Sequence, residues 1–111
     1  MDIQDELQNT IMMADASLKT LKSTSRQFVE AEKEYKTLLR LECLKLKEEG
    51  MAIGMIDKTC YGLDNVAAAR AKAHLAEMTY EANKEAMQWY KLKARLLDNQ
   101  IQREWNNPEG L

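Results

Sequence analysis

The stretch from residue 64 to residue 105 contains neither glycine nor proline. Within it, mostly apolar residues recur at alternating steps of three and four, the a/d spacing of a coiled-coil helix and not the alternation of a strand. Asp64 marks the expected start, and Pro108 follows the expected end. At 1.5 Å per residue this helix is about 60 Å long, so it must pack lengthwise against another long element. The seam comprises Val66, Ala69, Ala73, Ala76, Tyr80, Asn83, Met87, Tyr90, Ala94, Leu97 and Ile101.

The second half of this seam carries its larger side chains and one polar residue. Asn83 is either solvated on the seam or fixes the register of the pairing that satisfies its amide. We predict that the larger members form the seam along which the helices associate, including association between copies. They are Tyr80, Asn83, Met87, Tyr90, Leu97 and Ile101.

Residues 2–49 predict a second long helix with the same rhythm. Its expected seam runs Leu7, Ile11, Ala14, Leu18, Leu21, Ser25, Phe28, Glu32, Tyr35, Leu39, Glu42 and Leu46. After Phe28 glutamates fall on the seam, and a neighbouring stripe that includes Ala31 and Leu38 takes over, as expected for a straight helix with a period of 3.6. Residues 23–25, Ser-Thr-Ser, can bond their own backbone, so the helix either continues through them or bends there.

Residues 50–63 form the turn-rich part of the chain and hold three of its four glycines. Gly50 is placed to adopt the left-handed conformation after a helix end, and the spacing around Ile56 predicts a short helix before Gly62. The fold class expected is therefore all-α. A single domain, residues 1–111, forms an antiparallel hairpin of long helices with a short helix in the connecting loop.

Such a hairpin leaves many apolar residues without a neighbour, and a two-helix layer has little core per residue. One seam cannot cover Val29, Leu38, Leu41, Leu44, Met78, Leu92 and Leu96. Two hairpins related by a two-fold axis would form a four-helix bundle or coiled coil. We therefore predict a homo-oligomer, with a dimer favoured over higher states.

The composition of 45% hydrophobic and 31% charged residues suits a soluble helical protein. The net charge of −2 argues against non-specific binding of duplex DNA. Cys43 and Cys60 form no disulfide framework, which favours a reducing compartment. No segment resembles a signal peptide or a membrane span, so a cytoplasmic location without membrane contact is expected.

Catalytic and metal-binding patterns are not apparent in the sequence. His74 is the single histidine and has no set of ligands at metal-binding spacing. No glycine-rich phosphate loop occurs. We expect no cofactor, no metal and no enzymatic activity.

Two surfaces are candidates for binding. The first gathers bases and tryptophans near the C-terminus: Trp89, Lys93, Arg95, Arg103 and Trp105. It is either a partner surface, since Trp and Arg are enriched in such surfaces, or a set of seam residues with a solvated basic face. The second is a segment, residues 50–75, that resembles a helix-turn-helix motif. Its candidate DNA contacts are Arg70, Lys72 and His74.

Residues 46–106 resemble a group of small helical proteins encoded by phages and prophages of Gram-positive bacteria. The resemblance is carried by Gly50–Asp64, Arg70, Ala76-Glu77, Tyr80, Glu85-Ala86, Arg95-Leu96-Leu97, Gln100-Ile101 and Arg103-Glu104-Trp105. It implies a phage origin, the cytoplasm of a bacterial host, and a role in stoichiometric binding.

Three functions are compatible with this. The first is binding to a host or phage nucleic-acid-processing protein, including inhibition of a host defence nuclease. The second is DNA binding as an accessory or regulator of phage replication or recombination. The third is a structural coiled-coil component.

Overall fold

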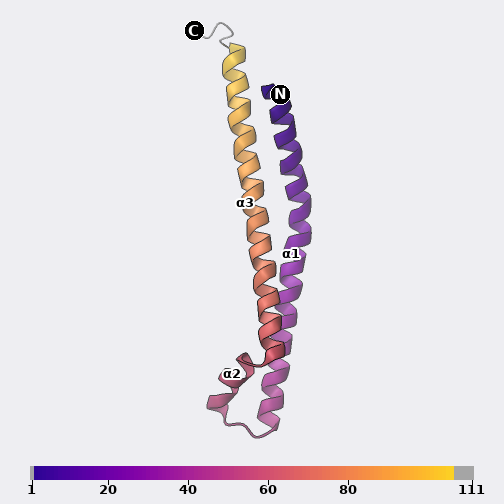
Figure 1. Ribbon diagram of the computed structural model, residues 1–111, viewed down its shortest axis with the longest axis vertical. Helices are drawn as coiled ribbons and strands as arrows, with labels where there is room; N and C mark the ends of the chain where they lie inside the picture. The colour runs from indigo at the N-terminus through magenta and orange to yellow at the C-terminus, as the bar shows by residue number, and fades with distance from the viewer. Residues whose placement is uncertain (1, 107–111) are drawn as a thin grey trace. The chain divides into compact units, whose positions relative to one another are not determined.

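The computed structural model describes residues 2–106, and all the regular secondary structure within this range is helical. Three helices follow in order: α1 (Ile3–Glu48), α2 (Ile53–Tyr61) and α3 (Asp64–Asn106) (Figure 1). The predicted all-α fold, with two long helices and a short helix between them, is confirmed. Pro108, the residue expected to follow the end of the last helix, lies outside the described residues.

The 46-residue helix α1 is unbroken through residues 23–25. At its start, the carboxylate of Asp2 accepts a hydrogen bond from the backbone N–H of Asp5 at 2.8 Å, which satisfies a free donor of the first turn. At its end, the N–H groups of Gly50 and Met51 reach back to the carbonyls of Lys47 and Leu46. This is a Schellman arrangement, and Gly50 has the positive φ of 89° expected for it.

Helix α3 begins at Asp64, the expected start, but Asp64 is not its capping residue. The N–H of Ala67 bonds the carbonyl of Leu63 at 2.8 Å, so Leu63 occupies the capping position and Asp64 is the first helical residue. A carboxylate in the first turn still suits the positive end of the helix dipole. The amide oxygen of Asn65 accepts a hydrogen bond from the N–H of Val66 at 2.9 Å.

The contacts divide the chain into two units, which we describe separately. The loop unit is Thr24–Tyr80, and the terminal unit is Met1–Ser23 with Glu81–Leu111. The boundary within α1 follows Ser23, in the segment where the sequence allows a bend.

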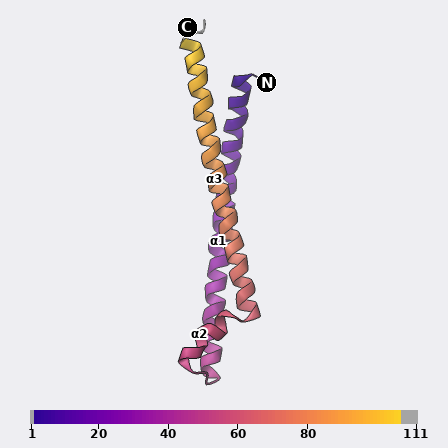
Figure 2. The same ribbon diagram turned by 60° about the vertical axis from the view of Figure 1, so that its left-hand side comes forward.

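The loop unit holds α2 against the two long helices near their connection (Figure 2). Its buried apolar residues are Ala31, Ile56, Cys60, Val66 and Ala73. The thiol of Cys60 donates to the carbonyl of Leu39 at 3.3 Å, and this contact attaches α2 to α1. Phe28 on α1 and Tyr80 on α3 stack with ring centroids 5.9 Å apart.

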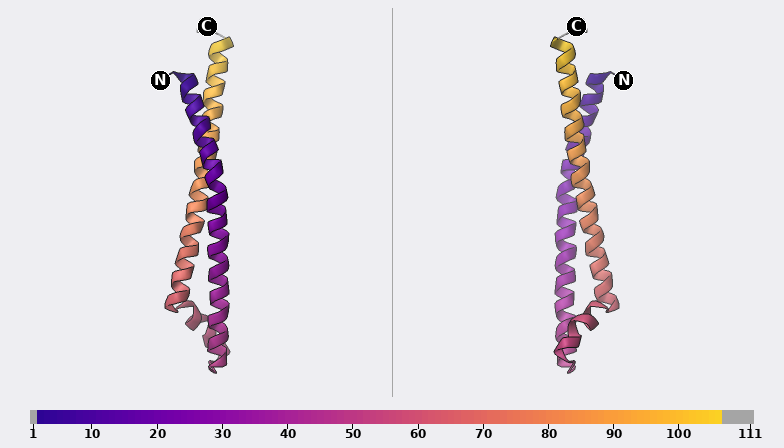
Figure 3. Two further views of the ribbon diagram at one scale, coloured as in Figure 1. Left: turned by 90° about the vertical axis from the view of Figure 1, so that its right-hand side faces the viewer. Right: turned by 90° about the vertical axis from the view of Figure 1, so that its left-hand side faces the viewer.

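The terminal unit pairs the first part of α1 with the last part of α3 in antiparallel orientation (Figure 3). The side-chain amide of Asn83 donates to the carbonyl of Ser17 at 3.0 Å. Further along, Lys93 forms an ion pair with Glu6 at 3.8 Å. Seam residue Asn83 therefore bonds the neighbouring helix directly, which is the register-fixing alternative of the two considered.

The packed face of α1 lies one residue away from part of the seam expected from the sequence. Ile11 and Leu18 are 52% and 48% exposed, whereas Thr10 and Thr24 are buried. The buried or half-buried set with a seven-residue repeat is Thr10, Ser17, Thr24 and Ala31. These side chains are small, which allows a second backbone to approach. The hydroxyl of Thr10 is satisfied by the carbonyl of Glu6 at 2.8 Å, so its burial carries no unpaired polar group.

Candidate interaction surface

The terminal unit has no apolar core of its own among the residues described. Every buried apolar residue of residues 2–106 lies in the loop unit, and the one buried side chain of the terminal unit is Thr10. Burial of apolar surface is the main favourable term in folding, so this unit stabilises itself poorly. The terminal unit is therefore the part of the molecule that gains most from a partner.

Helix α3 presents large apolar side chains to solvent in this unit. Trp89 is 56% exposed, Leu96 is 54% exposed and Leu92 is 38% exposed. Each stands two positions after a seam residue, and two residues correspond to about 200° around a helix. These side chains therefore lie on the side of α3 opposite the face that packs on α1. We call the part of this row from residue 85 to residue 103 the outer stripe, and all six of its residues are exposed: Glu85, Trp89, Leu92, Leu96, Asn99 and Arg103.

The six predicted association residues face inward within the chain. Tyr80, Asn83, Met87, Tyr90, Leu97 and Ile101 are all partly buried. Tyr80 stacks on Phe28 and Asn83 bonds Ser17, so this seam joins α3 to α1 of the same chain. A contact with another copy would have to use a different face, because these side chains are already packed.

The predicted partner residues are spread around α3. Trp89 and Arg103 belong to the outer stripe, and Arg95 is exposed on its flank. Lys93 is partly buried and engaged with Glu6. Trp105 is 82% exposed and borders a hollow of about 530 Å³ that is also lined by Ile3, Gln4, Ile101 and Glu104. The C-terminal part of α3 thus has two aromatic anchors on one helix.

The three predicted DNA contacts do not form one surface. The guanidinium of Arg70 donates to the carbonyl of Tyr61 at 2.9 Å and lies 3.7 Å from the centre of its ring. Lys72 forms an ion pair with Glu34 at 3.2 Å. His74 is exposed and shares a shallow hollow with Arg70, whereas Lys72 borders a different one. Arg70 and Lys72 are thus used in contacts that hold the loop unit together.

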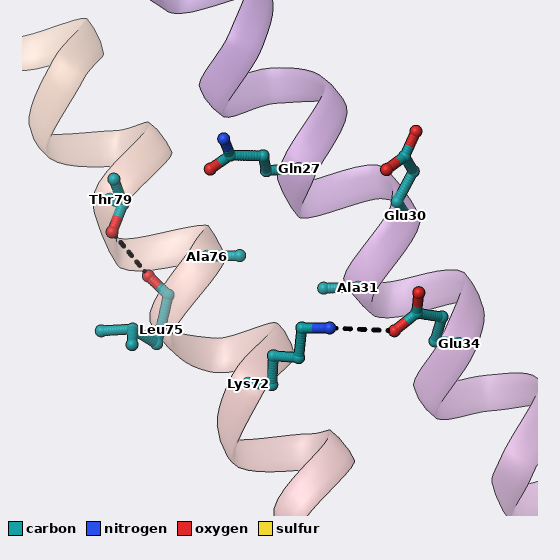
Figure 4. Close-up of a pocket in the computed structure, with 8 residues that line it drawn as sticks. All are labelled: Gln27, Glu30, Ala31, Glu34, Lys72, Leu75, Ala76 and Thr79. Carbon is teal, nitrogen blue, oxygen red and sulfur yellow. Dashed lines mark hydrogen bonds and ion pairs between the residues drawn. The ribbon is translucent and has the colours of Figure 1, made fainter.

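A groove between α1 and α3 in the loop unit is shown in Figure 4. Ala31 and Ala76 point toward each other across its floor, and the ion pair of Lys72 and Glu34 spans one end. The groove measures about 330 Å³ and is also lined by Gln27, Glu30, Leu75 and Thr79. None of its lining residues is a serine, a cysteine or a histidine. Its hollow follows from the small size of the two alanines.

The cysteines lie near each other where α2 meets α1. Cys60 is fully buried and Cys43 is partly buried. Burial raises the pKa of the Cys60 thiol from 9.0 to about 11, with a smaller contribution from Cys43. A thiol with such a pKa is protonated at neutral pH and is a poor nucleophile, so Cys60 acts as a small buried residue.

Within residues 2–106 no group of three or more His, Cys, Asp and Glu side chains is arranged to hold a metal ion. None of the described helices is both long enough and apolar enough to cross a membrane. No protein-family model, curated protein or solved structure matches the chain.

Sequence reasoning missed the difference between the two units. The repeat of small residues at positions 10, 17, 24 and 31 was the available signal, because a seven-residue spacing of small side chains favours close helix contact. The outer stripe was visible only in part, through Leu92 and Leu96.

Proposed function

We propose that this protein is non-enzymatic and acts by stoichiometric binding of another protein, with the terminal unit as its binding part. The observation that carries the proposal is a helix pair without a fully buried apolar residue among those described, combined with Trp105, which is 82% exposed beside a hollow lined by Ile3 and Ile101. An exposed tryptophan beside an apolar hollow is typical of an interaction site.

The proposed contact with the partner centres on the end of α3. Trp105 provides a large exposed ring beside the hollow lined by Ile3 and Ile101, while Arg103 adds a planar donor nearby. Trp and Arg dominate the binding energy of protein interfaces because they bury much area and retain polar contacts. Lys93 and Arg95 extend this surface.

The resemblance to small helical phage proteins suggests the partner class to test first. It is a nucleic-acid-processing protein of host or phage, acting in the cytoplasm of a bacterial host. A small rigid helical surface that occupies a nuclease would block it at a one-to-one ratio, which makes inhibition of a host defence nuclease the leading form of the proposal.

The test titrates the purified chain against host nucleases, including RNA-guided ones, and measures cleavage against molar ratio. We expect cleavage to fall as the molar ratio increases and to level off at a fixed stoichiometry. Replacing Trp105 by Ala should weaken binding about 30-fold, which corresponds to roughly 2 kcal/mol for an interface anchor. Met55→Ala, an exposed apolar residue on α2, is the control and should leave inhibition unchanged. A salt-sensitive complex with DNA and no effect on any nuclease would refute the proposal in favour of DNA binding.

We also propose that the chain self-associates into a dimer, which brings four long helices together. The chain exposes 8535 Å². A compact protein of 12.8 kDa exposes about 6,300 Å². The excess of about 2,200 Å² is larger than the roughly 800 Å² per partner that a stable interface buries. Light scattering distinguishes this dimer from a monomer and from the open-ended assembly expected of a structural coiled coil.

A further inference from the structure

The steps in residue number between successive members of the outer stripe are the same whether they are counted from its N-terminal or its C-terminal end. Its six residues, Glu85, Trp89, Leu92, Leu96, Asn99 and Arg103, follow one another at steps of four, three, four, three and four. A helix face with this spacing can lie against an antiparallel copy of itself with every residue opposite another member of the row. Isologous contacts of this kind are what two-fold dimers use.

We infer that the outer stripe is the dimer interface, with α3 of one copy packed antiparallel against α3 of a second copy. This rests on the proposed self-association and names the face that forms it. Centred between Leu92 and Leu96, the pairing puts Leu92 opposite Leu96 of the second copy. At both ends Glu85 then lies opposite Arg103.

The chemistry of each pair supports this alignment. The centre is apolar, and all four leucines of the two stripes meet there. Each end pairs a carboxylate with a guanidinium, so both ends of the interface are complementary in charge. Trp89 lies opposite Asn99, a smaller side chain that leaves space for an indole and can accept its N–H. A shift of the alignment by one heptad in either direction would separate Glu85 from Arg103 and place Leu96 opposite Glu85 or Asn99.

Other faces of the terminal unit are less suited to a second copy. The seam of α3 is already packed on α1 through Asn83 and Ser17. On α1, Ile11 and Leu18 are exposed and share a face, but the charged residue Asp15 lies between them on it. Met12 and Met13 are also exposed, but as consecutive residues they point in different directions. The outer stripe is the one continuous row that α3 offers in the described part of this unit.

In the proposed dimer, two basic residues, Lys93 and Arg95, border the outer stripe near the two-fold axis. Each lies opposite the same residue of the second copy. Lys93 is balanced by Glu6 of its own chain. Arg95 is exposed, so its long side chain can extend into solvent where salt screens the repulsion. The apolar centre and the two charged ends outweigh this local repulsion.

The experiment is a charge swap on the full chain, read by sedimentation equilibrium. Glu85→Arg and Arg103→Glu should each weaken dimerisation about 10-fold, because each turns two attractions into two repulsions; this equals about 1.4 kcal/mol. The double variant should recover the native dissociation constant to within about threefold. Asp98→Arg is the matched control, since it makes the same change in charge on α3 outside the stripe, and it should have no effect.

A second variant tests the apolar centre. Leu96→Glu should render the chain monomeric, whereas Leu75→Glu, at an even more exposed leucine of α3 in the loop unit, should leave the dimer intact. Helix content by circular dichroism verifies that each variant folds. A native chain that is monomeric at 100 µM would overturn both the proposed dimer and its interface. A dimer that resists all stripe variants would overturn the interface alone.

Discussion

Val66 offers a direct measure of how much of the stability resides in the loop unit. It is 0% exposed, whereas Val29 on α1 of the same unit is 61% exposed. Val66→Ala removes about two methylene equivalents worth roughly 0.8 kcal/mol each and leaves a cavity worth about 1 kcal/mol more. The better helix propensity of alanine returns about 0.5 kcal/mol, so the net loss is about 2 kcal/mol. Val29→Ala gains the same propensity and loses little burial, so its effect should stay within about 0.5 kcal/mol.

The assay is urea unfolding followed by circular dichroism at one fixed protein concentration. With a slope of about 1–3 kcal/mol per molar urea, the midpoint of Val66→Ala should fall by about 1 M. The comparison with Val29→Ala isolates burial, because both substitutions change the same atoms. Equal midpoints for the two variants would refute the conclusion that the apolar core lies around Val66, Cys60 and Ile56.

Three further predictions concern the loop unit. Gly50→Ala should cost about 1–2 kcal/mol in urea unfolding because of its φ of 89°, whereas Gly54→Ala, with nothing within 4 Å of an added Cβ, should stabilise α2 by up to about 1 kcal/mol. Arg70→Ala should lower stability by about 1–2 kcal/mol through its contacts with Tyr61, while Lys72→Ala, from an exposed ion pair, should change it by less than about 0.5 kcal/mol. A thiol reagent at pH 7 should modify Cys43 before Cys60. Because the pKa of the Cys60 thiol is raised in the folded chain, the thiol loses its proton at a lower pH in the unfolded chain than in the folded one. The free energy of unfolding should therefore decline as pH rises from about 9 through about 11. An unchanged urea midpoint across this range would contradict the burial of the thiol.

The seam of α3 could be predicted from the sequence because it keeps regular steps of three and four, with small residues near one end and large residues near the other. All eleven seam residues are buried or half-buried. On α1 the sequence offered two rows one residue apart, and the rule that large apolar residues pack inward selected the wrong one at Ile11 and Leu18. Counting from the bond between Ser17 and Asn83, Thr10 lies level with Tyr90. A large ring on one helix needs a small neighbour on the other helix. Which residues face each other depends on how the two helices pair, and the sequence of one helix alone does not give this.

The division into two units could not be read from the sequence for a related reason. Both long helices carry apolar residues along their whole length, but α2 contributes Ile56 and Cys60 only to the loop unit. A third helix is what converts a two-helix layer into a small core. Sequence patterns predict which side of a helix is apolar, but they do not report how many neighbours that side receives.

The hydrogen bond between Asn83 and Ser17 joins residues 66 positions apart. During synthesis at about 5–20 residues per second, the first part of α1 therefore waits about 3–13 seconds before its neighbour on α3 exists. Throughout this interval Leu7 and Ala14, which are half-buried in the folded chain, have no α3 beside them, while the loop unit closes through contacts of shorter range in sequence. The terminal unit is thus completed last, at a time when other chains and chaperones have already had access to α1.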